Sequence, residues 1–250
     1  MKYMGSKSRI AKYIVPIIQK CIDENNITNY YEPFCGGCNI IDKINCTNRF
    51  ASDSNPYLIG LFKHLQSDGE LLNEVSREIY TEVRKNYKSN LYENWYVGNI
   101  GFLASYNGKF FDGGYAPNRW EKTKYGLRLR DYYKEAKNSI VAQKSAIKDF
   151  FYCCDYRQLN TKKSFIYCDP PYANRQQYSN ATNFDHDEFW EVMRNWSKDN
   201  FVLVSELIAP NDFICIWEKL TSRSINTTNK SKDTEKLFIY KDGLFAEQYE

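Results

Sequence analysis

The sequence contains no apolar stretch approaching the ~20 residues that a membrane-spanning helix needs. Its opening residues, Met1-Lys2-Tyr3-Met4-Gly5, lack the apolar run of a secretory leader. Internal repeats, low-complexity blocks and long Gly/Ser linkers are missing as well. We therefore expect a cytoplasmic protein with no membrane partner.

Patterns for metal binding and histidine catalysis are also scarce. The two histidines, His64 and His186, accompany no nucleophile motif, so we expect no catalytic role for either. Cys35-x-x-Cys38 lacks a second cysteine pair and a suitably spaced histidine, which disfavours a zinc or redox site. Eight cysteines in 250 residues suit free thiols in a reducing compartment better than a small disulfide-stapled fold. We predict no metal site.

The composition fits a globular protein that is open to nucleic-acid binding. A hydrophobic fraction of 42% supplies a sizeable core, which argues against disorder. The formal net charge of +3 permits nucleic-acid binding without requiring it. The 21 tyrosines can serve the core, and they can also stack on bases.

Strand and helix patterns alternate at both ends of the chain. A helical pattern covers 6–25, with Ser6 as its cap, and Pro16 either kinks this helix or starts a second one. It precedes strand patterns at 29–32 and 49–52 and helical patterns at 39–44 and 56–65. Strand patterns return at 150–154, 164–168, 201–205 and 237–240, with a helix at 185–196. This alternation predicts an α/β fold with a largely parallel sheet.

The alternation is interrupted between residues 61 and 148. Helical patterns occupy 70–87 and 127–144, and the region 96–120 is rich in Gly, Asn and aromatic residues without a clear period. We predict an inserted, mainly helical lobe at 61–148, flanked by residues 1–60 and 149–250 of one α/β domain.

The most specific pattern is Asp169-Pro170-Pro171-Tyr172, directly after the strand pattern at 164–168. Ligands of open α/β sheets bind beyond the carboxyl ends of the strands. The prolines restrict the backbone, so the Asp169 carboxylate and the Pro170 carbonyl form two fixed acceptors. Two acceptors can grip an aromatic amine and free its lone pair to attack a methyl sulfonium, while Tyr172 stacks on the ring. The alternative is an ordinary turn with a surface tyrosine.

A glycine-rich turn, Glu32-Pro33-Phe34-Cys35-Gly36-Gly37, follows the first strand pattern. Such a turn lets a ligand approach the backbone closely. It matches neither G-x-G-x-x-G nor a P-loop, which disfavours a nucleotide-binding oxidoreductase. Asp53 ends the next strand pattern, where it can accept hydrogen bonds from ribose hydroxyls or act as a helix N-cap.

As a set, these motifs resemble the Dam-type DNA adenine-N6 methyltransferases of bacteria and phages. The motifs are Tyr3-Met4-Gly5-Ser6-Lys7, Glu32 to Gly37, Asp53-x-Asn55, Asp155-Tyr156 and Asp169 to Tyr172. Their order is similar to the α-arranged class, with the cofactor half first, then target recognition, then catalysis. The resemblance implies a Rossmann-like sheet and methyl transfer from S-adenosylmethionine (AdoMet) to N6 of a flipped adenine in double-stranded DNA.

The resemblance also implies residue roles. It places Lys7 near the methionine part of AdoMet, Asp53 at the ribose and Asp155 at the cofactor adenine. Cys38 stands where many relatives have a third glycine. The implied cofactor-binding residues are Tyr3, Lys7, Glu32, Pro33, Phe34, Cys35, Gly36, Gly37, Asp53, Asn55, Asp155, Tyr156 and Asp169; the implied catalytic residues are Asp169, Pro170, Pro171 and Tyr172.

DNA contacts are expected mainly from the inserted lobe. The stretch 104–111 resembles one in phage members of the family, which implies DNA contacts by Tyr106, Asn107 and Lys109. The expected phosphate contacts are the basic residues Lys122, Lys124, Arg128 and Arg130, whose alternative role is that of a solvated surface. We interpret the polar run 221–236 as a further DNA-contacting loop.

Several alternatives remain open at this point. The substrate of the transfer can be cytosine N4, RNA adenine or a glutamine amide, and the chain can be a catalytically silent DNA-binding relative. We expect a monomer or weak dimer. The recognition sequence and the presence of a restriction partner do not follow from the sequence.

Overall fold

The computed structural model describes residues 1–147, 150–172, 184–224 and 230–249. The α-helices are α1 (Ala11–Glu24), α2 (Pro56–Gln66), α3 (Arg77–Asn86), α4 (Asn94–Gly98), α5 (Tyr132–Gln143) and α6 (His186–Ser197). The strands are β1 (Asn29–Glu32), β2 (Asn48–Asp53), β3 (Arg119–Thr123), β4 (Gly126–Arg130), β5 (Phe150–Cys153), β6 (Phe165–Cys168), β7 (Phe201–Glu206), β8 (Phe213–Ser224) and β9 (Lys230–Tyr240).

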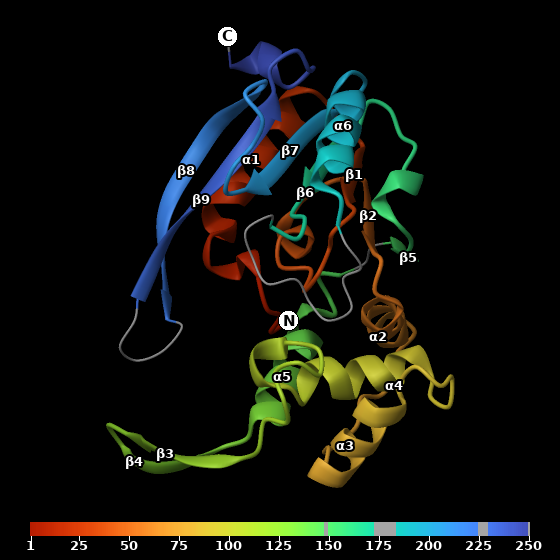
Figure 1. Cartoon of the computed structure of the whole chain (residues 1–250), viewed down its shortest axis with the longest axis vertical. Helices are drawn as coiled ribbons and strands as arrows, with labels where there is room; N and C mark the ends of the chain where they lie inside the picture. The colour runs from red at the N-terminus through yellow and green to blue at the C-terminus, as the bar shows by residue number, and fades with distance from the viewer. Residues whose placement is uncertain (148–149, 173–183, 225–229, 250) are drawn as a thin grey trace. The chain divides into compact units, whose positions relative to one another are not determined.

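Seven strands form one sheet in the order β5-β2-β1-β6-β7-β9-β8 (Figure 1). β6 pairs in parallel with β1 and with β7, whereas β9 runs antiparallel to β7 and to β8. All four residues of β6 are buried, as expected for a parallel strand that is covered on both faces. The predicted α/β class is therefore confirmed.

The chain divides into two compact units. The first comprises Met1–Ile17, Cys35–Asn45 and Ala51–Cys154, and the second comprises Ile18–Phe34, Cys46–Phe50 and Asp155–Glu250. Cys35, Gly36 and Gly37 of the glycine-rich turn consequently belong to the first unit, together with Asp53. Its first residues, Glu32, Pro33 and Phe34, belong to the second unit, as does the Asp-Pro-Pro-Tyr segment.

In the second unit, helix α6 covers one face of the strands. Its buried residues Phe189 and Met193 belong to an apolar cluster with β6, β7, β8 and β9. The cluster contains Tyr156, Ile166, Cys168, Phe189, Trp190, Met193, Val202, Val204, Phe213 and Phe238. Burying one large apolar side chain contributes about 1.5–3 kcal/mol, so this layer stabilises the strand ends that carry the tetrapeptide.

In the first unit, α2 and α4 approach closely because glycine lies on both helices. A Cβ at Gly98 would lie 2.2 Å from the Tyr57 carbonyl oxygen, and one at Gly60 would lie 2.8 Å from the Asn94 Cβ. Two rings on separate segments, Tyr57 and Phe110, stack at 5.4 Å between centroids. Aromatic residues from separate segments thus contribute to the core of the first unit.

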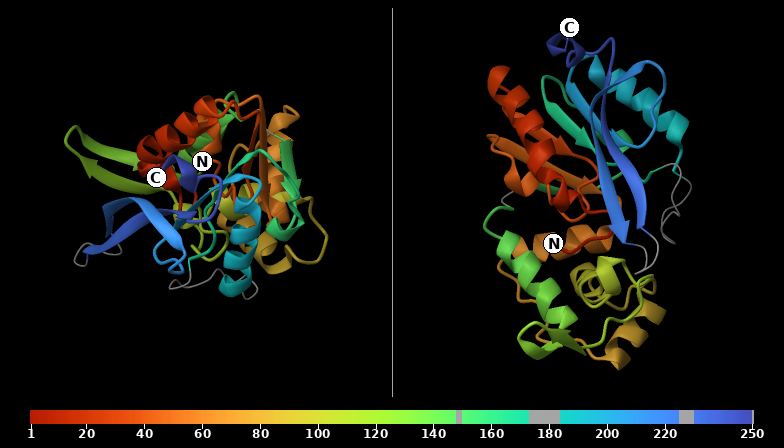
Figure 2. Two further views of the ribbon diagram at one scale, coloured as in Figure 1. Left: turned by 90° about the horizontal axis from the view of Figure 1, so that it is seen from above. Right: turned by 90° about the vertical axis from the view of Figure 1, so that its left-hand side faces the viewer.

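Two predicted helices are wrong in extent. The predicted helix at 70–87 is the shorter α3, which begins after the N-cap Ser76. The predicted helix at 127–144 begins only at Tyr132, after the N-cap Asp131, and the residues before it form the antiparallel ribbon β3–β4 (Figure 2). Leu127 and Leu129 alternate with basic residues at a strand period of two. The predicted helix wrongly included these residues because Leu129 also fits the helical pattern that follows.

Two other expectations change in detail. The predicted helix at 39–44 is a single 3-10 turn, Ile41–Lys43. The run 221–236 is largely strand, because β8 ends at Ser224 and β9 begins at Lys230; its centre, 225–229, lies outside the described residues. Within the described part of the chain, no helix combines the length and apolar character required to cross a membrane.

Candidate active site

The Asp-Pro-Pro-Tyr segment lies at the carboxyl end of the central strands. The parallel registers pair Tyr31 with Ile166 and Cys168 with Val204. Glu32, the last residue of β1, and Asp169, the residue after β6, therefore lie at the same edge of the sheet, the position at which ligands bind in open α/β folds.

Tyr172 is not a surface residue. Its side chain is only 6% exposed, and its hydroxyl donates a hydrogen bond to Glu235 Oε2 at 2.8 Å and lies 3.1 Å from Ser205 Oγ. Burial, together with the charges of Asp169 and Glu235, raises the pKa of Tyr172 well above its usual value. The interpretation of this segment as a turn with an exposed tyrosine is therefore wrong.

Carboxylates concentrate around this edge. Glu32 is buried and accepts a hydrogen bond from the Tyr30 hydroxyl at 3.4 Å. Burial raises the pKa of the Cys168 thiol, and Asp169 and Glu32 raise it further. The local environment thus disfavours another anion and favours a cation.

Phe34 and Tyr156 form an aromatic wall in the second unit. Their ring centroids lie 5.1 Å apart, and each ring also contacts Phe189 of α6. The preceding residue, Asp155, caps a 3-10 turn by accepting from the Arg157 backbone N–H. Hydrogen bonds from the Arg157 guanidinium reach both Asp155 carboxylate oxygens and lower the pKa of that carboxyl.

In the first unit, Asp53 braces the glycine-rich turn. Asp53 Oδ2 accepts from the Gly36 backbone N–H at 3.2 Å, and Oδ1 accepts from the Asn55 N–H at 2.9 Å. The N-cap of α2 is Asn55, whose side chain accepts from the N–H groups of Tyr57 and Leu58. Asp53 is therefore not the cap of α2. Burial raises its pKa, which the two backbone hydrogen bonds partly offset.

The turn owes its shape to glycine and to the packing of Tyr3. Gly36 has a φ of +46°, and a Cβ there would lie 2.9 Å from Tyr3 Cε1. A Cβ at Gly37 would lie 2.7 Å from Tyr3 Cβ. Cys38 also has a positive φ, +53°, a backbone conformation that favours glycine.

Lys7, the remaining predicted residue of the N-terminal motif, is buried. It opens the 3-10 turn Lys7–Arg9, which is capped by Ser6, whose side chain accepts from the Ser8 N–H. The expected cap at Ser6 is thus confirmed, although it caps a 3-10 turn that precedes α1.

Two polar residues that support these motifs were not identified from the sequence. Gln143, at the end of α5, donates from Nε2 to the carbonyl of Cys38 at 3.2 Å and to Asp42 Oδ2 at 2.9 Å. Glu235 contacts Tyr172 from β9. Neither residue has a local sequence signal, because each contact joins segments that are far apart in the chain.

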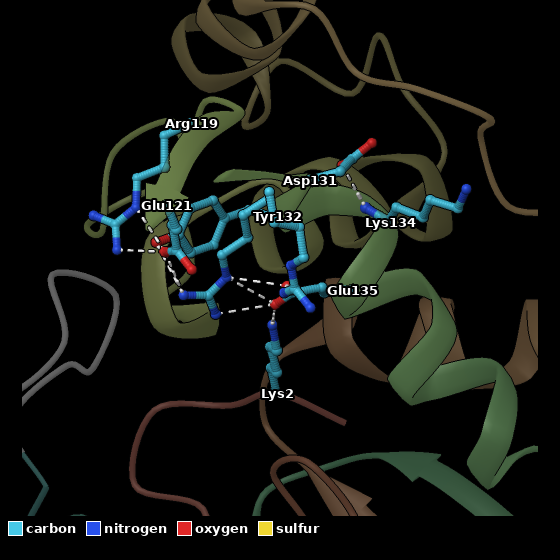
Figure 3. A network of polar contacts seen from close by, with 9 residues as sticks. Lys2, Arg119, Glu121, Asp131, Tyr132, Lys134 and Glu135 are labelled. Carbon is cyan, nitrogen blue, oxygen red and sulfur yellow. Dashed lines mark hydrogen bonds and ion pairs between the residues drawn. The ribbon is translucent and has the colours of Figure 1, made fainter. Parts of the chain in front are cut away.

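The predicted basic residues lie on or beside the β3–β4 ribbon. Arg130 joins Glu121 at 3.1 Å and Glu135 at 3.0 Å, and Glu135 also binds Lys2 at 2.7 Å (Figure 3). These hydrogen bonds, from Arg130 first, lower the pKa of Glu135 to about 2. The Arg130 guanidinium is thus held by Glu121 and Glu135 at the base of the ribbon, the end where β4 leads into α5.

The other predicted DNA contacts divide into two groups. Tyr106 opens a 3-10 turn, and its ring packs edge-on against Tyr132 with 5.3 Å between the centroids. Asn107 in the same turn is exposed and has a φ of +56°. Lys109, the residue after the turn, is half-buried. Lys122, Lys124 and Arg128 are exposed on the ribbon, and Arg128 reaches Glu135 at 3.2 Å. The ribbon also exposes the apolar side chains of Trp120, Tyr125, Leu127 and Leu129.

No metal-binding geometry is found among the described residues, where no group of three or more His, Cys, Asp or Glu side chains could hold an ion. All eight cysteines are free thiols. His64 stacks on Trp95 with centroids 3.8 Å apart, and His186 is the first residue of α6.

A seven-stranded α/β sheet with an Asp-Pro-Pro-Tyr corner at a strand end defines a methyltransferase-like enzyme. The family model described as D12 class N6 adenine-specific DNA methyltransferase matches residues 3–199, and the chain belongs to this family. The predicted activity, adenine-specific DNA methylation, is thereby confirmed over cytosine N4 and RNA methylation.

Curated relatives agree with the family. A DNA adenine methylase of Haemophilus influenzae is 27% identical over 76% of this chain and 68% of its own length. One from Vibrio cholerae is 26% identical over 76% and 70%, and a type II methyltransferase of Methanocaldococcus jannaschii is 24% identical over 76% and 74%. A solved candidate RNA methyltransferase from Pyrococcus horikoshii is 8% identical with a TM-score of 0.44, covering 94% of this chain and 85% of its own, which is too distant to bear on function.

Proposed function

We propose that this enzyme transfers the methyl group of AdoMet directly to N6 of an adenine that is flipped out of double-stranded DNA. The observation that carries the proposal is the anchored Asp169-Pro170-Pro171-Tyr172 corner at the carboxyl end of β6. N6 is hydrogen-bonded inside the duplex, so the base must leave the stack at a cost of a few kcal/mol.

The corner supplies two acceptors for the amine. The Asp169 carboxylate and the Pro170 carbonyl each accept one N6 hydrogen, which turns the nitrogen lone pair away from the ring system and toward the methyl donor. As the N–C bond forms, the bond from the methyl carbon to sulfur would break, with its electron pair left on the neutral thioether, and N6 then carries one proton too many and a positive charge. The Asp169 carboxylate stabilises that charge and is placed to take the proton.

Each unit, taken by itself, carries residues that suit AdoMet binding. Bound AdoMet supplies an electrophilic methyl group on a positively charged sulfonium. In the first unit, the Gly36 and Gly37 backbone permits close approach and Asp53 has further acceptor capacity for ribose hydroxyls. In the second unit, the Phe34 and Tyr156 rings offer an apolar wall, and the carboxylates around Asp169 suit a cation.

For Asp155, the proposed partner is the adenine of AdoMet. Its two carboxylate oxygens already accept from Arg157, so an adenine amino group would add to an existing ion pair. We propose that Asp155 and Arg157 act together, with the ion pair holding the carboxylate in a fixed orientation.

We propose that residues 61–148 recognise the target, with the β3–β4 ribbon as the main DNA-contacting element. Its exposed lysines can neutralise phosphates, and its exposed aromatic and leucine side chains can pack against bases. Arg130, held by Glu121 and Glu135, stiffens the base of the ribbon, so we assign it a supporting role.

The proposed activity is tested with tritiated AdoMet and duplex DNA, followed by digestion of the DNA to nucleosides. The expected label is N6-methyldeoxyadenosine, with none in N4-methyldeoxycytidine and little transfer to RNA. Label in cytidine, or no transfer to any duplex of mixed sequence, would contradict the proposal.

Removing both ribbon lysines, Lys122→Ala with Lys124→Ala, is expected to weaken DNA binding by about 10–100-fold near 0.15 M salt. The slope of log K against log salt is negative, with a magnitude of ~0.9 for each phosphate contact, so losing two contacts should reduce that magnitude by roughly 1.8. Fluorescence anisotropy at several salt concentrations measures both quantities. Lys198→Ala, an exposed lysine after α6, is the matched control. An unchanged salt slope in the double variant would show that the ribbon lysines do not touch phosphate.

A further inference from the structure

Glu235 is a buried carboxylate that belongs to none of the motifs discussed above. It lies on β9 and is 6% exposed. On one side, Glu235 pairs in register with Lys219 of β8. On the other side, the pairing of β9 with β7 begins one residue later, where Lys236 lies opposite Glu206. The position places its side chain within reach of the residues that follow β6 and end β7.

The Glu235 side chain contacts the tetrapeptide through Tyr172. The Tyr172 hydroxyl donates to Glu235 Oε2 at 2.8 Å, and Ser205 Oγ lies 3.1 Å from the same hydroxyl. Tyr172 has one hydroxyl proton, so with that proton directed to the carboxylate, Ser205 must be the donor to the Tyr172 oxygen. The three side chains form a directed chain from Ser205 through Tyr172 to Glu235.

This arrangement has an energetic reason to be rigid. A buried carboxylate is costly unless it is hydrogen-bonded, and a hydrogen bond to a charged acceptor is about twice as strong as one between neutral groups. Pro170 and Pro171 restrict the backbone on one side of Tyr172, while Glu235 and Ser205 hold the far end of its ring. Both the plane of the ring and the backbone that carries Asp169 are then fixed.

We propose that Glu235 is a positioning residue for the methyl transfer, acting through the Tyr172 hydroxyl to hold the ring against which the flipped adenine stacks. The inference rests on the proposed function of the tetrapeptide. Glu235 touches neither base nor methyl donor in this role. Its contribution is to present Tyr172, and with it the Asp169 and Pro170 acceptors, in one arrangement.

A double-mutant cycle on the full chain tests the role. Glu235→Gln keeps the shape of the side chain and an amide acceptor but loses the charge, and Tyr172→Phe keeps the stacking ring but loses the hydroxyl. Each single variant is expected to lower kcat for a duplex substrate by about 10-fold, with a much smaller change in KM, because the defect lies in the orientation of bound adenine. The combined variant should be no slower than Tyr172→Phe alone, because the two changes remove the same hydrogen bond.

Controls separate positioning from folding. Glu218→Gln changes a solvent-exposed glutamate of neighbouring β8, whose ion-pair distance to Lys236 is 3.9 Å, and should leave kcat unchanged. Thermal unfolding of each variant reports its folded state. If Glu235→Gln proves unstable, Ser205→Ala breaks the same chain at its other end and should lower kcat without adding to the effect of Tyr172→Phe.

The outcomes distinguish the positioning role of Glu235 from the proposed methyl transfer itself. Losses of kcat that multiply in the combined variant would overturn the role of Glu235, while an active wild type would leave the proposed function standing. Full kcat in Glu235→Gln would overturn the role as well. A wild-type chain that makes no N6-methyldeoxyadenosine would overturn both.

Discussion

Asp169→Ala should abolish methyl transfer while leaving AdoMet affinity within a few-fold of the wild type. The variant loses the carboxylate that grips one N6 hydrogen and stabilises the developing positive charge. Removing one such preorganised group costs on the order of 10²–10³ in kcat, and here the same group also receives the proton, so we expect at least about 10³. Single-turnover assays measure the rate, and calorimetry measures AdoMet binding.

Two further variants sharpen this result. Asp169→Asn keeps one acceptor oxygen and the size of the side chain, so it should retain more activity than alanine. Asp199→Ala, an exposed aspartate paired with Lys162, should behave as the wild type. Activity of Asp169→Ala comparable to that of Asp199→Ala would refute the catalytic assignment.

Gly36→Val should raise the Kd for AdoMet by about 100-fold or more. Valine at the φ of +46° is a genuine backbone outlier, and its Cβ would lie 2.9 Å from Tyr3 Cε1. The backbone strain costs about 1–3 kcal/mol, and the required shift of the Tyr3 ring or of the turn adds to it. Calorimetric titration with AdoMet, in the absence of DNA, measures the change.

Gly114→Val provides the matched control for this prediction. Gly114 also has a positive φ, +70°, but a Cβ there would meet no heavy atom within 4 Å. The control therefore carries similar backbone strain at a position away from the turn, and it should bind AdoMet like the wild type. Equal AdoMet affinity in both valine variants would show that the turn does not form part of the cofactor site.

Short-range patterns explain which local features could be predicted. The buried β6 and the prolines behind it come from adjacent residues, so the position of Asp169 at a strand end followed from the sequence. The cap at Ser6 involves a backbone N–H only two positions further along the chain. For Asp53, whose position could be predicted, the sequence left two roles open. The structure excludes the cap role because Asn55 caps α2, and the Asp53 side chain instead accepts from the Gly36 N–H, 17 residues away.

The errors arose where two local patterns overlap. Leu129 fits both the strand period of Leu127 and the helical period that continues from Tyr132, and only the N-cap Asp131 separates them. Each strand of the β3–β4 pair is stabilised mainly by the other strand, so the residues of one strand alone carry little sequence signal for strand structure. The same reason explains why 221–236 looked like a loop before β8 and β9 were seen to pair.

The sequence alone therefore predicted methyl transfer to an aromatic amine, because that chemistry depends on a short, rigid segment that can be interpreted residue by residue, and the resemblance of the motif set to a family indicated adenine as the substrate. Only the tertiary structure decided which polar groups support that segment. The hydrogen bonds of Tyr172 to Ser205 and Glu235 span 33 and 63 residues, and that of Gln143 to Cys38 spans 105. Such partners are brought together by burial and strand pairing, which no local pattern encodes.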